Sequence, residues 1–251
     1  MRLIIAIISF SIAIFISPIR SYSQNGKAFA VVELFTSEGC NSCPPADKIL
    51  SEISAEARKN NQEIYCLAYH VDYWNRLGWK DPYSKLQFTQ RQENYSRVLP
   101  SKELYTPQMV VNGKIEFTGS KKEKSTAALE AALKMPAAVQ LSIQIDSTAS
   151  DTIYISWKLS KTDKNNVLQI AFTESGLVSN VIKGENAGKT LKHDHVVRSF
   201  TAVNNPGSTG QVRMVVKGRD AKVQSELIAF LQHKQHYGIA AATGIKNPGK
   251  K

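Results

Sequence analysis

The feature that most constrains this chain is a C-x-x-C pair placed between two segments of different periodicity. Residues 29–36 form a near-continuous apolar run, which is typical of a strand buried on both faces. Beyond Cys43, apolar residues recur at the spacing of one helix face: Ala46, Ile49, Leu50, Ile53 and Ala57. Pro44 and Pro45 fit the first turn of a helix, where backbone N–H groups lack partners. The sequence therefore predicts a strand, a turn that holds Cys40 and Cys43, and a helix.

The segments that follow extend this unit to the order β-α-β-α-β-β-α. We expect a strand at 63–71, a polar helix at 83–98, strands at 108–111 and 114–118, and a helix at 120–135. Asn112-Gly113 between two apolar runs predicts a hairpin. A strand–helix–strand connection of this length implies a right-handed parallel crossover.

Beyond Pro136 the apolar period changes to two. Alternating segments occur at 139–145, 153–159, 168–172 and 212–216, and a last hairpin is expected to turn near His236–Gly238. This pattern predicts an antiparallel sandwich. The sequence therefore predicts an α/β domain over residues 24–136 and a smaller all-β sandwich-like domain over residues 137–243. A flexible tail over residues 244–251 is expected to follow.

The first 23 residues have the layout of a secretory signal peptide. Arg2 precedes an apolar run, and Ser21-Tyr22-Ser23 supplies a small-x-small pattern, so we expect cleavage near Ser23. The run is short for a permanent membrane span of about 20 residues. The protein is therefore predicted to be exported, either periplasmic or secreted, where a disulfide can persist.

The charge pattern argues against a nucleic-acid partner. The chain carries a formal net charge of +11, but its positive residues are scattered and form no basic face interleaved with aromatic residues.

The cysteine pair has three interpretations. At a helix start, partial positive charge and free N–H groups lower the pKa of a cysteine, so Cys40 is predicted to be the exposed nucleophile and Cys43 the resolving cysteine. Zinc sites need two further ligands, which the third cysteine, Cys66, does not supply from within an apolar strand. A purely structural disulfide is a less favoured explanation, because the short loop that Cys40 and Cys43 would close gives little stabilisation.

Four longer motifs resemble a known family. They read VVELFTSEGCNSCPPAD, HVDYWNRLGWKDP, YTPQMVVNG and GENAGKTLKHDHVVR. Together with the element order, they resemble an exported bacterial thioredoxin-like family of undefined function, within the thioredoxin superfamily, over nearly the whole mature chain. The fold class implied is a thioredoxin-like α/β fold followed by the β-rich domain.

The resemblance also implies roles for two residues. Pro107 would be a cis-proline packed against Cys40 and Cys43, and the backbone of Thr106 would pair with a substrate strand. The sequence departs from ordinary thioredoxins because Asn41-Ser42 replaces the usual Gly-Pro and no Trp precedes Cys40. The direction of exchange therefore stays open, because the intervening residues tune redox poise.

Four further residues are candidates for support of the site. His70 and Asp72 end the second strand on one face, so His70 is predicted to stabilise a thiolate or move a proton, with Asp72 orienting it, unless both only bind the following loop. Glu33 is either a buried carboxylate that relays protons to Cys43 or a solvated strand start. Trp74 either walls a peptide groove or packs in the loop.

Other polar residues carry weaker expectations. Glu38 would oppose a thiolate if it lay close to one, and Cys66 is expected to be a buried apolar thiol. His193 and His195 share a face, but two ligands do not make a metal site and a hairpin end is favoured.

The sequence thus favours an exported thiol–disulfide oxidoreductase that needs no cofactor beyond the Cys40–Cys43 pair. Its partners would be protein thiols or disulfides, or a redox partner protein. The alternative is a non-catalytic binding module, which would bind a protein partner or hold a metal such as copper through Cys40, Cys43 and His70.

Overall fold

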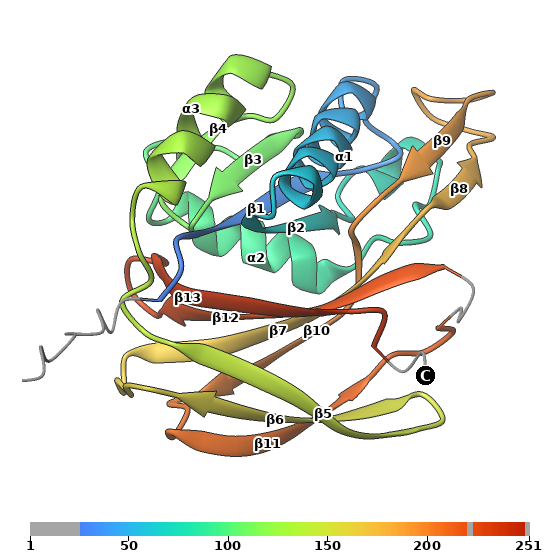
Figure 1. Ribbon diagram of the computed structural model, residues 1–251. Coiled ribbons are helices and arrows are strands. Elements are labelled where there is room, and N and C mark those ends of the chain that lie inside the picture. Colours follow the sequence, from blue (N-terminus) through green and yellow to red (C-terminus); the bar gives the residue numbers. More distant parts are fainter. Residues whose placement is uncertain (1–25, 220–222, 249–251) are drawn as a thin grey trace, which may run out of the picture.

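The strand–turn–helix unit expected around the cysteines is present. The computed structural model describes residues 26–219 and 223–248. Strand β1 (Phe29–Thr36) is buried along its whole length, as its unbroken apolar run predicts. Helix α1 (Pro44–Lys59) starts with its two prolines and buries the predicted apolar stripe against the sheet (Figure 1).

The rest of the described chain forms two further helices, one short 3-10 helix and twelve strands. Up to residue 133 the elements are β2 (Glu63–His70), η1 (Asn75–Leu77), α2 (Leu86–Ser96), β3 (Gln108–Val111), β4 (Ile115–Thr118) and α3 (Lys122–Leu133). Then follow β5 (Leu141–Ala149), β6 (Thr152–Leu159), β7 (Asn166–Ser175), β8 (Leu177–Asn180), β9 (Thr190–His193), β10 (Val196–Asn204), β11 (Thr209–Val215), β12 (Gln224–His233) and β13 (Ile239–Lys246). The hairpins expected at Asn112-Gly113 and before residue 239 are both confirmed.

The strands form one large mixed sheet, and this overturns the predicted fold class. The large sheet has eight strands in the order β13-β12-β7-β10-β2-β1-β3-β4, so strands from both expected domains share it. The two groups join where β10 pairs with β2 in parallel, at Val196 and Ala68. A thioredoxin-like α/β fold followed by a smaller all-β sandwich-like domain is therefore wrong, although the elements of residues 29–133 come in the expected order.

Burial on both faces explains why the β-rich part is not a separate sandwich. In a two-layer sandwich each strand would bury one face, yet β7 is buried at almost every position. Ala171 contacts one hydrophobic core, while its neighbours Ile170 and Phe172 contact another. A strand covered on both sides must belong to a central layer, and the alternating pattern of its residues did not reveal the second cover.

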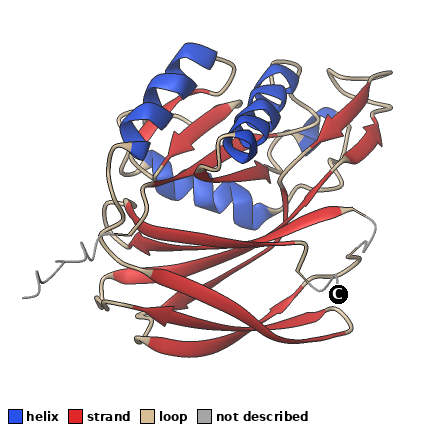
Figure 2. Ribbon diagram, in the orientation of Figure 1, coloured by secondary structure: helices blue, strands red, loops and turns tan. Residues whose placement is uncertain are grey.

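The elements stack in layers, which Figure 2 shows by type of structure. Helices α1 and α3 cover one face of the sheet around β1 and β3. Helix α2 lies on the other side of these strands and packs between them and the part of the sheet that contains β7 and β12. The separate three-stranded sheet β11-β6-β5 covers that lower part from outside.

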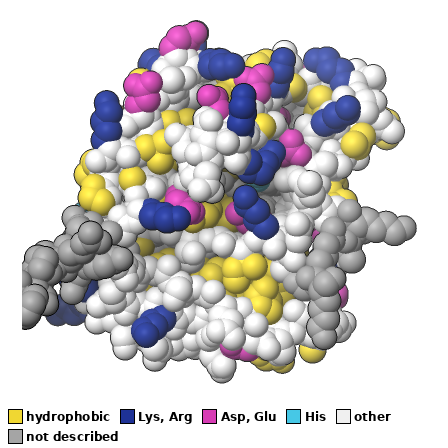
Figure 3. Space-filling model, viewed as in Figure 1, with side chains coloured by type: hydrophobic (Ala, Val, Ile, Leu, Met, Phe, Trp, Pro, Cys, Tyr) yellow, Lys and Arg dark blue, Asp and Glu magenta, His cyan; other side chains and the backbone are white. Residues whose placement is uncertain are grey.

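The chain ends bear on three sequence predictions. The expected signal peptide over residues 1–23 lies outside the described residues. Strand β13 continues to Lys246, three residues into the segment that we expected to be a flexible tail. Within the described ranges, no helix is long and apolar enough to cross a membrane. On the face seen in Figure 3, Lys and Arg side chains lie scattered, with Asp and Glu side chains among them.

Candidate functional site

The two cysteines form a disulfide at the start of helix α1. Their Cα atoms lie 5.4 Å apart, and Cys43 is the residue that caps the helix. The turn closes through hydrogen bonds from the Cys40 amide to the Ser37 carbonyl and from the Cys43 amide to the Cys40 carbonyl, each 3.2 Å long. The predicted pairing and its place at a helix N-terminus are therefore present.

The exposure of Cys40 differs from the prediction. Both cysteines are completely buried, whereas Asn41 and Ser42 between them are exposed. The expectation that Cys40 would be an exposed nucleophile is therefore wrong. A segment far away in the sequence also binds the backbone of this turn.

That segment is the loop between β8 and β9, residues 181–189, which we call the cover loop. The amide nitrogen Nδ2 of Asn186 donates to the carbonyls of Glu38 and Cys40, at 2.8 and 3.0 Å, and the Asn186 side chain is itself fully buried. The carboxylate of Glu185 accepts a 3.1 Å hydrogen bond from the Asn41 amide. The cover loop therefore binds the polypeptide on both sides of Cys40.

Trp74 and the Thr106–Pro107 pair border the same turn. The Thr106–Pro107 peptide bond is cis, as the resemblance implied. The indole N–H of Trp74 donates to Thr106 Oγ1 at 2.8 Å, and Trp74 lies so close to Gly39 that a Cβ added there would be 3.0 Å from the Trp74 Cβ. Trp74 is thus packed in the loop and tied to Thr106, and Pro107 is buried.

Pro107 also lies near the beginning of helix α1. A Cβ added to Gly119 would be 3.1 Å from the Cβ of Ala46 and 3.5 Å from the Cβ of Pro107. The structure therefore brings Thr106, Pro107 and Trp74 to the surroundings of the cysteine turn.

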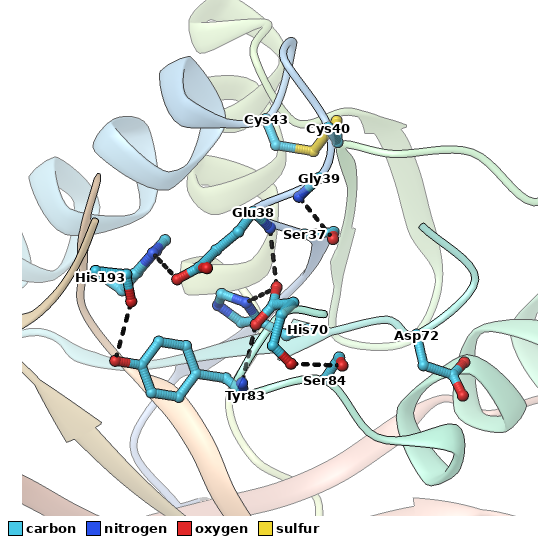
Figure 4. A network of polar contacts seen from close by, with 12 residues as sticks. Ser37, Glu38, Gly39, Cys40, Cys43, His70, Asp72, Tyr83, Ser84 and His193 are labelled. Atoms are coloured by element: carbon cyan, nitrogen blue, oxygen red, sulfur yellow. Dashed lines mark hydrogen bonds and ion pairs between the residues drawn. A yellow bond between two sulfur atoms is a disulfide. The ribbon is translucent and has the colours of Figure 1, made fainter. Parts of the chain in front are cut away.

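Five ionisable residues gather beside the same turn, and we call them the histidine cluster. Its members are Glu38, Asp47, His70, Asp81 and His193, of which Figure 4 labels Glu38, His70 and His193. All are buried except Asp47, which is partly buried. The chain places them there through the turn after β1, the first turns of α1, the end of β2, the loop before α2 and the end of β9.

The histidine cluster contains two carboxylate–imidazole pairs. His70 Nδ1 lies 2.7 Å from Asp81 Oδ2, and His193 Nε2 lies 3.1 Å from Glu38 Oε1. The Glu38 amide also donates to Asp81 at 2.9 Å, so the two pairs are joined through the backbone. The two imidazole rings have centroids 5.0 Å apart.

Each imidazole has one nitrogen that is not used. Nε2 of His70 and Nδ1 of His193 are buried and have no hydrogen-bond partner among the described residues. Buried polar atoms are normally paired, so unpaired ones need an explanation. A group that exchanges protons is one such explanation, because it must leave a position free.

The pKa values of the cluster are displaced in different directions. Burial raises the pKa of Asp47 above its ordinary value, although His193 and His70 oppose this. Burial would lower the pKa of His70, but the Asp81 carboxylate outweighs burial and raises it. Burial would likewise raise the pKa of Asp81, yet His70 holds it below its ordinary value. Groups shifted in this way are concentrated at functional sites.

Comparison with known proteins identifies the family. A family model described as "Protein of unknown function (DUF1223)" matches residues 31–232. The chain belongs to this family. The DUF1223 chain is also similar to the crystal structure of a protein from Agrobacterium tumefaciens, a structural genomics target. The two are 25% identical, the match covers 91% of this chain and 98% of that one, and the TM-score is 0.67. The search of curated proteins found no match.

Asp72 does not orient His70 in this DUF1223 protein. Its carboxylate accepts a 2.5 Å hydrogen bond from the Thr89 hydroxyl of α2, and Figure 4 shows it apart from the cluster. The carboxylate that binds His70 is Asp81, eleven residues further along. Two residues on one face of a strand diverge here because β2 ends at His70 and the chain turns.

Glu33 belongs to a second buried group, which we call the arginine cluster and which also contains Arg91, Tyr95 and Gln232. Glu33 is fully buried, with its carboxylate 2.5 Å from Arg91 Nε and accepting from the Tyr95 hydroxyl at 2.5 Å. Alternate residues of β1 point to opposite faces of the sheet. Glu33 therefore shares the face of Val31 and Phe35, which packs against α2, whereas Leu34 faces α1. Glu33 is therefore a buried carboxylate, as one interpretation held, and not a solvated strand start. It is not placed to relay protons to Cys43, because it points to the face opposite α1.

Other cysteine and histidine predictions have mixed outcomes. Cys66 is a buried thiol, as expected, and burial raises its pKa. The His193 side chain pairs with Glu38, whereas the charged neighbours of the buried His195 side chain are Asp194 and Arg58. Among the described residues, no group of three or more His, Cys, Asp or Glu side chains is placed to hold a metal ion.

Sequence reasoning missed Asp81, Asn186 and the pairing of His193 with Glu38. The motifs that contain these residues were visible, but nothing local indicates that Asn186 meets the carbonyl of a cysteine 146 residues earlier. A signal that was present is the polar content of the motifs HVDYWNRLGWKDP and GENAGKTLKHDHVVR, in which Asp81 and Asn186 had no assigned role.

Proposed function

We propose that this protein exchanges disulfides with protein thiols through the Cys40–Cys43 pair. The observation that carries the proposal is the histidine cluster beside the disulfide. Burying several ionisable groups costs free energy, and a disulfide that only cross-linked the turn would need none of them. Proton-handling groups beside a disulfide are useful when its sulfurs alternate between bonded and protonated forms.

The exchange would run in two balanced steps. A thiolate of the partner attacks Cys40 Sγ, the S–S bond breaks, and its electron pair leaves with Cys43 Sγ as a thiolate that takes up a proton. A second partner thiolate attacks the mixed disulfide and releases Cys40 as a thiolate. The partner dithiol is then oxidised and the pair is reduced, and the reverse sequence oxidises the pair.

Two features of the structure support this chemistry. The N-terminus of α1 carries partial positive charge, which favours a thiolate at Cys43. Asp47 follows Cys43 by one helical turn, which places both residues on one helix side. Its raised pKa suits a group that supplies a proton to the leaving sulfur.

The remaining sequence predictions belong to the same proposal. Pro107 and Thr106 lie near the cysteine turn and would shape the contact with a partner segment. Export after removal of residues 1–23 would bring the pair into a compartment where disulfides persist.

A second candidate is a binding module in which the disulfide is purely structural. The complete burial of both sulfurs favours it. No arrangement of the described residues favours the copper-binding form of this alternative.

Equilibration with glutathione buffers separates the two candidates. The fraction of reduced pair is measured by alkylation and mass spectrometry, in a Cys66→Ala background so that only the pair is counted. Exchange predicts a reduction potential above about −300 mV, whereas structural disulfides lie below that value. A potential below it, with unfolding on reduction, would contradict the proposal.

Partner capture gives an independent test. Cys43→Ser should trap mixed disulfides at Cys40 in the native compartment, because the resolving thiol is missing. Cys40→Ser/Cys43→Ser is the matched control and should capture none. An equal yield from both variants would count against exchange.

A further inference from the structure

We infer that the cover loop must move off the disulfide before exchange, and that Asn186 is the residue that holds it closed. The inference rests on the proposed function, and it adds that the cover loop must open before the Cys40–Cys43 pair can react. It assigns a role to the GENAGKT motif, which the exchange chemistry itself does not use.

The attachment of the cover loop is concentrated in one side chain. Asn186 donates both hydrogen bonds to the carbonyls of Glu38 and Cys40, and its own oxygen accepts from Lys189 Nζ at 2.9 Å. Most of the rest of the loop is exposed, including Ile182 at 72%. Within the loop, all of which the structure describes, only Val181 and Asn186 are buried. Little apolar burial therefore holds the loop in place, which is typical of segments that open locally.

The loop is also built to move as a unit. Its ends are joined by hydrogen bonds between the backbones of Val181 and Lys189 and of Gly188 and Val181, at 3.0 and 2.8 Å. Strands β8 and β9 form a two-stranded sheet of their own, so a displacement of this hairpin breaks no pairing of the eight-stranded sheet. Figure 1 shows the hairpin projecting beside the start of α1.

Three contacts anchor the base of the same hairpin. His193 binds Glu38, Asp194 accepts from the Ser51 hydroxyl of α1 at 2.7 Å, and Ser179 lies 3.5 Å from the Tyr83 hydroxyl. The base can therefore stay attached while the tip, where Asn186 lies, opens. Opening at the tip would expose the Cys40 side of the disulfide.

The rate of disulfide reduction tests the role of Asn186. The oxidised protein is treated with dithiothreitol or with reduced glutathione, and the lost disulfide is followed by quenched alkylation. Asn186→Ala is expected to raise both rates by about tenfold or more, because two hydrogen bonds of the closed state are removed. The factor should be the same for both reductants, since opening precedes either attack.

Asn180→Ala is the matched control. Asn180 lies on the same hairpin, is exposed, and bonds the Thr190 hydroxyl rather than the cysteine turn. Its rates should stay within about twofold of the unaltered protein. If Asn186→Ala reacts no faster than this control, the inference is overturned.

Two milder variants keep the test decisive if Asn186→Ala does not fold. Glu185→Ala removes the bond to the Asn41 amide, and Lys189→Ala removes the support of the Asn186 side chain. Each is expected to raise the reduction rates severalfold, and unchanged rates in both would overturn the inference.

The outcome is separable from the fate of the proposed function. A reduction potential in the range of structural disulfides, together with faster reduction of Asn186→Ala, would support the opening of the cover loop and refute the exchange function. A reduction potential in the exchange range, with unaltered reduction rates in Asn186→Ala, would support the proposed function and refute the opening of the cover loop.

Discussion

The protein buries two groups of charged side chains, and they differ in how completely their atoms are paired. In the arginine cluster, the Arg91 guanidinium binds Glu33, Tyr95 and Gln232. The Tyr95 hydroxyl in turn binds Arg91, Glu33 and Gln232. Arg91 also lies 5.0 to 5.5 Å from four aromatic ring centroids. In the histidine cluster, two imidazole nitrogens have no partner among the described residues.

This difference separates a structural role from a chemical one. A fully paired buried ion pair fixes the packing of α2 against the sheet and has no free position for a proton. A cluster with unused nitrogens and displaced pKa values keeps positions through which protons can move, and it lies beside the disulfide. The experiments below are ordered from the largest expected effect to the smallest.

Arg91→Met should break the arginine cluster most severely. The variant leaves Glu33 buried without its cation, which costs about 3–5 kcal/mol of unfolding free energy. Urea denaturation of the oxidised protein measures the loss, and Glu33→Gln/Arg91→Met should recover part of it. The potential of the Cys40–Cys43 pair should not change where the variant folds. A loss under about 1 kcal/mol would show that this cluster does not hold the core together.

His195 provides a buried histidine outside both clusters, and its effect depends on pH. Burial lowers its pKa to about 4 from 6.5. Between these values the unfolded chain binds a proton that the folded chain does not, so the stability contribution of His195 falls as the pH is lowered from about 6.5 to about 4. The loss amounts to about 3 kcal/mol.

His195→Asn isolates this contribution, because asparagine tolerates the positive φ of 58° at this position. The difference in unfolding free energy between the two proteins is followed by urea denaturation from pH 8 to pH 4. Between pH 8 and pH 4 this difference should shift by about 3 kcal/mol in favour of the variant. A difference that stays constant with pH would refute the assignment.

Asp81→Asn should break the histidine cluster. The expected loss of unfolding free energy is smaller, about 2 kcal/mol, because the amide can still accept hydrogen bonds. The raised pKa of His70 gives stability that is present below 6.5 and lost as the pH rises through the folded value. The lowered pKa of Asp81 gives stability that is present above 3.8 and lost as the pH falls through the folded value. The loss should therefore be largest between about pH 4 and 6.5.

The same variant should also change the pH profile of disulfide exchange, whereas Arg91→Met should not. Exchange rates with glutathione from pH 5 to 9 measure this contrast. Identical profiles for Asp81→Asn and the unaltered protein would remove the distinction between the two clusters.

Thr89→Val should have the smallest effect. It removes the hydroxyl that binds Asp72, with an expected loss of about 1 kcal/mol in urea denaturation. Exchange rates should be unaltered, because Asp72 lies outside the histidine cluster. A slower exchange would return Asp72 to the site that the sequence analysis assigned to it.

Local patterns predicted the parts of the fold and site that depend on neighbouring residues. The apolar run of β1, the helical stripe of α1 and the Asn112-Gly113 hairpin are each specified within about a dozen residues. Asp72 was assigned to His70 on strand period alone, and this failed because the strand ends between them. Glu33 was judged by its strand without knowledge of Arg91, 58 residues away.

The sequence alone determined that Cys40 and Cys43 could pair at a helix start, because spacing and helix periodicity are local properties. Only the tertiary structure decided that the pair is buried, that His193 binds Glu38, and that strands of both halves share one sheet. Those outcomes depend on Asn186, His193 and Val196, which reach the cysteine turn and β2 from more than a hundred residues away. Contacts at that separation are set by the packing of whole layers, which no local pattern encodes.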